Sequence, residues 1–153
     1  MNLEEQVISL DYARKLALLG VKQESIFKFS FSMINARKDC YDIVRHTSLE
    51  IMKGDYSAFT TNELFDLLPA VIDTKKDEPF NKFHMHLVKR NIKNIEYILN
   101  YYCDTQQYKK DGDPFFLPNL IQNNIYDEKL PDALAKLLIA LIEMEYVKYE
   151  KWW

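Results

Sequence analysis

The chain has 153 residues, and a single domain of this length buries roughly 68–70% of its unfolded surface. Its 20 Lys and Arg against 23 Asp and Glu leave a formal charge of −3, which argues against nucleic-acid binding through overall charge but not against a local basic patch. Gly20, Gly54 and Gly112 are the three glycines, and their wide spacing excludes glycine-rich phosphate-binding loops. We therefore predict one compact domain over residues 1–153.

The cysteines and the first residues indicate a cellular compartment. Cys40 and Cys103 are too few for a disulfide framework and form no closely spaced metal-type pair, so we expect buried thiols in a reducing environment. The opening sequence MNLEEQVISLDYARK carries acidic residues where a secretory signal carries positive ones. No apolar run of about 18 residues follows. The chain is expected to be cytoplasmic and to have no membrane segment.

The first predicted element is a helix that Ser9 caps, because apolar residues recur at helical spacing directly after it. Gly20 is expected to end this helix. A Schellman motif with glycine at that position brings Val21 against Leu16, and both residues are apolar.

At residue 26 the hydrophobic period changes from helical to alternating. Phenylalanine at every second position predicts a half-buried strand over residues 26–33. A polar turn at 35–39 leads to a second predicted strand at 40–46, with Tyr41 and Ile43 on the same side.

The segment TTNELFDLLP at 60–69 carries the plainest local signal. Thr60 stands three residues before Glu63, so the two side chains can cap each other's backbone amides in a capping box. Phe59 precedes the box as a staple residue, and Pro69 marks the exit of a short helix. A short extended segment is expected at 70–73.

A β-hairpin is predicted next, because apolar and polar residues alternate over 83–88 and again over 95–102. The polar sequence KRNIKN at 89–94 is expected to form its tip. The stretch DTQQYKKDGDP at 104–114 is the most loop-like part of the chain and is expected to be mobile.

The last predicted element is a helix over about residues 131–147. Pro131 suits its first turn, and a wide apolar stripe indicates packing on two flanks or at a subunit interface. Together these elements predict an α+β fold, with an antiparallel sheet of about four to five strands and helices packed mainly on one face.

Three segments carry a resemblance: ISLDYARKLALLGVKQES at 8–25, YSAFTTNELFDLLP at 56–69 and LPDALAKLLIALIE at 130–143. They resemble a group of short uncharacterised proteins of gut bacteria and their phages or mobile elements. The resemblance covers about a third of the residues and implies a single compact domain in that genomic setting. It implies no activity and no catalytic residue, and the hairpin departs from the pattern of the group.

His84 and His86 are the candidate metal ligands, because residues two apart in a strand project from the same face. A metal site would need further ligands from Cys103, Asp104 or His46, and none is spaced to indicate one. Histidines on a sheet face are more often exposed or hydrogen-bonded than metal-bound. We therefore expect no metal and no cofactor.

No catalytic motif is visible. Cys40 and Cys103 lie in strand-like runs among Tyr and Ile, where a structural thiol is commoner than an activated one. The sequence DGD at 111–113 lacks the spacing of a calcium-binding loop. An enzyme is therefore the least favoured functional class.

The predicted hairpin tip carries Lys89, Arg90 and Lys93, which are expected to project together. A short helix followed by a hairpin with a basic tip is typical of a winged helix, whose wing contacts phosphate. Charged residues that protect a sheet edge are the commoner explanation. Glu63 and Asp66 in the preceding helix also argue against a DNA-reading surface.

Aromatic residues offer a second candidate surface. Trp152 and Trp153 are costly to leave in water, so they are expected to fold back on the domain or occupy a partner's groove. Tyrosines near the second hairpin strand could contact a protein partner or single-stranded nucleic acid, although core packing is commoner at strand spacing. These tyrosines are Tyr97, Tyr101, Tyr102 and Tyr108.

The leading functional prediction is a noncatalytic protein-interaction or accessory protein of phage or mobile-element origin. It would act as a homodimer or with a protein partner through Tyr97, Tyr101, Trp152 and Trp153. The alternative is a nucleic-acid-binding regulator that uses Lys89, Arg90 and Lys93.

Overall fold

A computed structural model describes residues 2–31, 41–45, 54–74, 82–103 and 120–149. The α+β class is confirmed, because the chain forms helices and antiparallel sheets. In chain order the elements are α1 (Leu3–Gln6), α2 (Leu10–Leu18), β1 (Phe27–Phe31), β2 (Tyr41–Arg45), β3 (Tyr56–Ser57), α3 (Thr61–Leu67), β4 (Val71–Asp73), β5 (Lys82–Asn91), β6 (Ile95–Cys103), β7 (Ile125–Asp127) and α4 (Leu130–Glu143).

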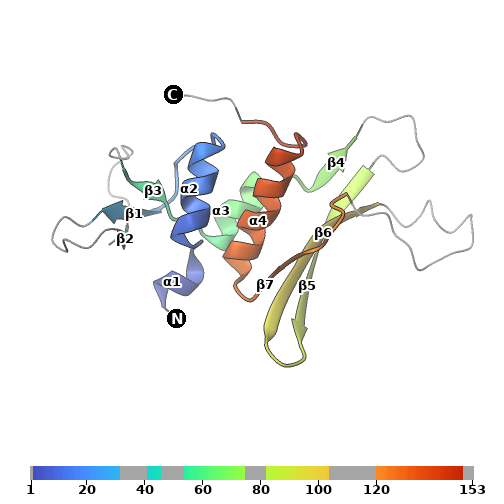
Figure 1. The fold of residues 1–153 in the computed structure, drawn as a ribbon, viewed down its shortest axis with the longest axis horizontal. Helices are drawn as coiled ribbons and strands as arrows, with labels where there is room; N and C mark the ends of the chain where they lie inside the picture. The colour runs from blue at the N-terminus through green and yellow to red at the C-terminus, as the bar shows by residue number, and fades with distance from the viewer. Residues whose placement is uncertain (1, 32–40, 46–53, 75–81, 104–119, 150–153) are drawn as a thin grey trace, which may run out of the picture.

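The strands form two sheets where the sequence suggested one. The first has the order β2-β1-β3 and the second the order β4-β5-β6-β7, and every pairing is antiparallel. All described strands before α3 belong to the first sheet, and all those after it belong to the second. Figure 1 shows α2, α3 and α4 between the two sheets. Each sheet therefore packs against helices on one face.

The helix α4 forms the centre of the core. It contacts α2 and α3 as well as β6 and β7, which confirms the expected packing on more than one flank. A helix with apolar residues around most of its circumference is stable in water only when neighbours cover it on several sides. Its buried residues are Pro131, Asp132, Ala133, Leu134, Ala135, Leu137, Leu138, Ile139 and Leu141.

The ending of α2 is the predicted Schellman motif. The amide of Val21 donates to the carbonyl of Leu16 at 3.0 Å, and the amide of Gly20 donates to that of Ala17 at 3.1 Å. Gly20 has φ of 89°, a left-handed conformation that glycine adopts without a Cβ penalty. Ser9 is the N-cap residue as expected, but its side chain makes no capping bond within its own helix.

The capping box at the start of α3 is confirmed. The amide of Glu63 donates to Thr60 Oγ1 at 3.4 Å, and the amide of Thr60 donates to Glu63 Oε2 at 2.7 Å. The same carboxylate accepts hydrogen bonds from Ser25 Oγ at 2.9 Å and from the amide of Ile26 at 2.8 Å. One glutamate therefore joins the helix start to the chain that enters β1.

The predicted first-sheet strands are confirmed as β1 and β2, with Phe29 directly opposite Ile43. The predicted turn at 35–39 lies outside the described residues. The short extended segment near residue 70 is confirmed as β4, which pairs with β5.

The helix α4 ends at Glu143, earlier than the predicted end near residue 147. A second Schellman motif closes it, in which the amide of Tyr146 donates to the carbonyl of Leu141 at 2.9 Å. Glu145 occupies the left-handed position with φ of 61°. This ending could not be predicted from the sequence, because glycine is the usual residue at the left-handed position and here it is a glutamate.

We expect Glu145→Gly to stabilise the protein by about 0.5–1 kcal/mol, because glycine removes the Cβ penalty of a left-handed residue. Thermal unfolding followed by circular dichroism should show a Tm higher by about 2–4 °C for a chain of this size. Ala140→Gly, inside α4, is the control and should lower the Tm, because glycine weakens a helix interior. A lower Tm for Glu145→Gly would contradict this account of the helix ending.

Candidate interaction surface

The predicted hairpin is confirmed as β5 and β6, whose ladder runs from Phe83 opposite Cys103 to Asn91 opposite Ile95. Its loop is shorter than the predicted tip at 89–94. Lys89, Arg90 and Asn91 all pair within the ladder, which leaves residues 92–94 to connect the strands.

Side chains alternate between two faces of this hairpin. The inner face, toward α4, buries Phe83, Leu99, Tyr101 and Cys103 in the core. The buried thiol expected for Cys103 is thus confirmed, whereas Cys40 lies outside the described residues. Near the base of the hairpin, the segment around Ile121 covers the outer face, and the Asn100 side chain donates a hydrogen bond to the carbonyl of Ile121 at 3.0 Å.

The far half of the hairpin, residues 86–97, has little cover, and we call it the distal hairpin. The strand β4 pairs with β5 only at residues 82–84, and β7 pairs with β6 only at residues 97–99. Figure 1 shows the hairpin extending past the start of α4. Its exposed aliphatic side chains are Leu87 (41% exposed), Val88 (53%), Ile92 (77%) and Ile95 (44%).

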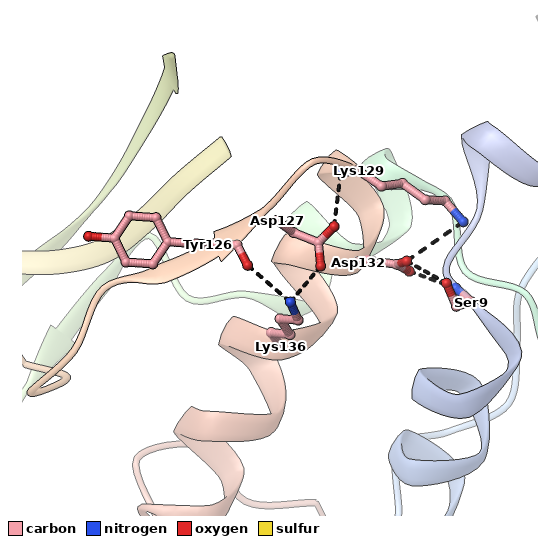
Figure 2. A network of polar contacts seen from close by, with 6 residues as sticks. All are labelled: Ser9, Tyr126, Asp127, Lys129, Asp132 and Lys136. Carbon is pink, nitrogen blue, oxygen red and sulfur yellow. Dashed lines mark hydrogen bonds and ion pairs between the residues drawn. The ribbon is translucent and has the colours of Figure 1, made fainter. Parts of the chain in front are cut away.

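A polar contact on α4 anchors the base of the hairpin through β7. Figure 2 shows Lys136 directed toward β7, where its Nζ donates to the carbonyl of Tyr126 at 3.0 Å and pairs with the carboxylate of Asp127. Burial lowers the pKa of Lys136, but the bond to Asp127, its charge and the contribution of Tyr12 outweigh that effect and raise the pKa overall. Because β7 pairs with β6, this cation ties the hairpin to the core.

A second contact of α4 fixes α2. The buried carboxylate of Asp132 accepts a hydrogen bond from the amide of Ser9 at 2.6 Å and another from the Ser9 hydroxyl (Figure 2). Lys129 Nζ lies 3.8 Å from the same carboxylate. An anion at a helix N-terminus is favourable, so Asp132 caps α2 from across the core.

The contact between Ser9 and Asp132 joins the start of α2 to α4. A nucleophilic serine is usually activated by a histidine within hydrogen-bond reach. The described histidines, His84 and His86, lie in β5 of the second sheet. The role of Asp132 could not be predicted from the sequence, because an aspartate in the first turn of a helix is usually explained by the helix dipole alone.

Among the described candidate metal ligands, His84 and His86 lie together but Cys103 does not join them. His84 and His86 share the outer face, opposite Tyr102 and Asn100, and the His86 ring meets the Tyr102 ring edge-on at 5.1 Å. Cys103 projects from the inner face, away from both. In the part of the chain that the structure describes, no three His, Cys, Asp or Glu side chains gather into a metal-binding group. The other suggested ligands, His46 and Asp104, lie outside the described residues.

The basic residues Lys89, Arg90 and Lys93 are all exposed on the distal hairpin, but they do not project together as expected. Neighbouring strand residues face opposite sides, so Lys89 lies on the inner face and Arg90 on the outer face. Lys89 Nζ lies 5.9 Å from the centre of the Tyr97 ring. Arg90 Nε donates to the Glu96 carboxylate at 3.1 Å, so part of its charge is neutralised.

The aromatic candidates have different environments. Tyr97 is half-buried on the inner face. Tyr101 is fully buried, so its assignment to a partner surface is wrong; its hydroxyl donates to the carbonyl of Pro69, and burial raises its pKa. Trp152 and Trp153 lie outside the described residues, as does the loop predicted at 104–114.

An open hollow of about 890 Å³ lies beneath the inner face of the distal hairpin. Its lining includes apolar side chains from three elements or their flanks, although Ile26 beside β1 is itself more than half exposed. The sequence could not show this hollow, because its walls come from distant segments. The apolar side chains are Ile26, Phe27, Ile95, Tyr97, Leu130 and Pro131.

Comparison of the chain with protein-family models, curated proteins and solved structures finds no match. None of the described helices is long and apolar enough to cross a membrane.

We expect Asp132→Ala to destabilise the protein by about 2–3 kcal/mol, because it leaves the Ser9 amide and hydroxyl without their charged acceptor. Denaturant unfolding followed by circular dichroism measures the change. Asp11→Ala is the matched control, since Asp11 is an exposed aspartate in the first turn of α2. The cap is not needed for stability if both variants unfold at the same denaturant concentration.

Tyr101 should make the free energy of unfolding depend on pH in the alkaline range. Burial raises its pKa, so the folded chain keeps a proton that the unfolded chain releases above about pH 10. This stabilisation is complete below pH 10 and is lost as pH rises, by about 1.4 kcal/mol per pH unit for one group. The pKa values of Lys136 and Tyr149 are also raised, so they act in the same direction.

We expect Tyr101→Phe to cost about 1 kcal/mol at pH 7, because it loses the bond to Pro69. It should also reduce the loss of stability between pH 10 and 11.5. Unfolding free energies across that range test this, and wild-type and variant curves that stay parallel would show that Tyr101 does not titrate on unfolding.

Proposed function

We propose that the protein is a noncatalytic protein-interaction module whose contact surface is the distal hairpin. The observation that carries this proposal is the group of exposed aliphatic residues that the distal hairpin holds beyond the core: Leu87, Val88, Ile92 and Ile95. Leu87 and Ile95 lie on the inner face, Val88 lies on the outer face and Ile92 lies in the loop. Single exposed apolar residues are normal on a protein, so the proposal depends on the concentration of four of them on one short hairpin.

The exposed group is concentrated in one place. Among the twelve large hydrophobic residues that are exposed in the described chain, four fall between positions 87 and 95. A fifth, Ile26, lines the hollow beneath the same hairpin. Ile26 and Ile95 line the hollow, whereas Val88 lies on the opposite face, so a partner must contact both faces of the hairpin to bury all five. A contact of that extent supports a protein partner.

The base of the hairpin is held firmly enough to present this surface. An isolated two-stranded hairpin is marginally stable in water, so the distal hairpin depends on its base. That base pairs with β4 and β7 and is tied to α4 through Lys136. A binding surface that is already ordered loses less entropy on association.

Nucleic-acid binding is the second candidate, supported by the exposure of Lys89 and Lys93. Phosphate binding depends on several cations that face one backbone. Lys89 and Arg90 face opposite sides of the hairpin, and Arg90 is paired with Glu96. The aliphatic group has no use on a phosphate backbone, so the protein partner is favoured.

The wider setting of this function rests on the sequence. An accessory role in a phage or mobile element follows from the resemblance of three segments, and a cytoplasmic location follows from composition. Trp152 and Trp153 stay predicted partner contacts, as an extension of the proposed surface. A second copy of the chain and an unrelated protein are both allowed as partners at this stage.

A photo-cross-linking amino acid at position 92 tests the proposal in the cell that makes the protein. Leu18 is the matched control, because it is as exposed (76%) as Ile92 (77%) but lies at the end of α2. We expect a discrete protein adduct from position 92 and none from position 18. Position 92 without an adduct, or with the same adducts as position 18, would show that the distal hairpin is not the contact surface.

A further inference from the structure

We infer that the partner adds an extended strand to the open edge of β5 and that this strand carries acidic side chains. The inference rests on the proposed function and gives it a binding mode and a partner chemistry.

The open edge is defined by where β4 stops. The strand β4 pairs with β5 from Val71 opposite His84 to Asp73 opposite Lys82. One further bond joins the amide of Met85 to the carbonyl of Ala70 at 3.4 Å. Beyond it, no described strand lies beside residues 86–91 of β5 on that side.

The direction of the Met85 amide shows which backbone groups this edge presents. In a strand, the amide and carbonyl of one residue point to the same side, and the next residue points to the other. Met85 points toward β4, so Leu87, Lys89 and Asn91 point outward along the open edge. The residues between them point toward β6. Three amides and three carbonyls are therefore positioned to pair with an added strand.

Aliphatic side chains flank these groups on both faces. An added strand would place alternate side chains beside Leu87 on the inner face and beside Val88 on the outer face. Both residues are exposed on the described chain and would lose water contact. Backbone pairing supplies affinity in this mode, and the flanking side chains supply specificity.

The charge of the edge determines the chemistry of the added strand. Residues 86–97 hold three cations, Lys89, Arg90 and Lys93, against one carboxylate, Glu96. Because Glu96 pairs with Arg90, Lys89 and Lys93 supply the net positive charge. This part is positive although the whole chain has a formal charge of −3. Opposite charges on neighbouring strands stabilise a sheet, so acidic residues on the added strand fit best.

A second copy of β5 fits this edge less well. Antiparallel pairing centred on Lys89 or on Arg90 would oppose two like charges, which destabilises a sheet. Pairing centred on Val88 would place Lys89 opposite Leu87 and Arg90 opposite His86, so neither cation would gain an acidic neighbour. Lysine on an edge strand is also a known protection against self-pairing. The observations therefore favour a different, acidic chain.

The first test uses the capped peptide TEVEVEVT, with TKVKVKVT and an N-methylated TEVEVEVT as controls. N-methylation removes the donors that an added strand needs, whereas the side chains stay the same. Amide hydrogen exchange followed by NMR reports on each β5 residue. We expect saturating acidic peptide to slow exchange at Leu87 and Lys89 at least tenfold, with little change at Val88, whose amide already faces β6. Both control peptides should leave exchange at Leu87 and Lys89 unchanged.

A matched pair of proline variants tests the backbone directly. Lys89→Pro removes an amide that faces the open edge, and proline is tolerated there. Val88→Pro removes an amide of the β5–β6 ladder. We expect Lys89→Pro to keep the fold and weaken peptide binding at least tenfold, and Val88→Pro to lower the Tm. If Lys89→Pro does not fold, the N-methylated peptide still decides the question.

Four outcomes would overturn the inference. The first two are equal binding of the acidic and basic peptides, and peptide binding that N-methylation does not change. The third is a dimer of this chain that Lys89→Pro abolishes. The fourth is steeply salt-dependent binding to duplex DNA while the acidic peptide does not slow amide exchange at Leu87 and Lys89. Cross-linking from position 92 in the Lys89→Pro background separates this inference from the proposed function. An adduct that persists there keeps the hairpin as the contact surface but excludes strand addition, whereas no adduct in the unmodified background rejects the proposed function itself.

Discussion

The burial of α4 is the constraint on which the rest of this structure depends. A helix whose apolar residues cover most of its circumference must be surrounded, and here α2, α3, β6 and β7 surround it. This requirement explains why the strands form two sheets, because a single sheet could cover only one side of the helix. The first sheet packs behind α2, and the second packs directly on α4.

Each charged side chain of α4 is bound to a neighbouring element. Asp132 holds the start of α2 through Ser9, Lys136 holds β7, and Glu143 pairs with Lys15 of α2 at 2.8 Å. Removing a charge from water is costly unless it finds a partner, so the buried Asp132 depends on its contacts with Ser9. The pair of Glu143 and Lys15 is half exposed and contributes less. The apolar surface of α4 stabilises the fold through burial. The charged residues of α4 bind α2 and β7 and so help to hold these elements in place.

The proposed surface begins where this core ends. The inner face of the hairpin is buried at Leu99 and Tyr101, where α4 covers it, and becomes exposed toward Ile95. The strands β4 and β7 are each three residues long, so β4 stops beside His84 and β7 reaches the distal hairpin only at Tyr97. The same short strands that fix the base of the hairpin therefore leave its aliphatic residues and one backbone edge available to a partner.

The sequence by itself determined the local structure. The Thr60 and Glu63 capping box, the Schellman ending at Gly20 and the alternation of the hairpin all involve residues close in the chain, whose geometry follows from spacing alone. Tertiary structure decided what spacing cannot encode. Tyr97 and Tyr101 share a strand and a face, yet α4 buries only the second, and Ser9 meets Asp132 across 123 positions. Burial, long-range caps and open edges depend on which distant segments become neighbours, and a single sequence does not record that choice.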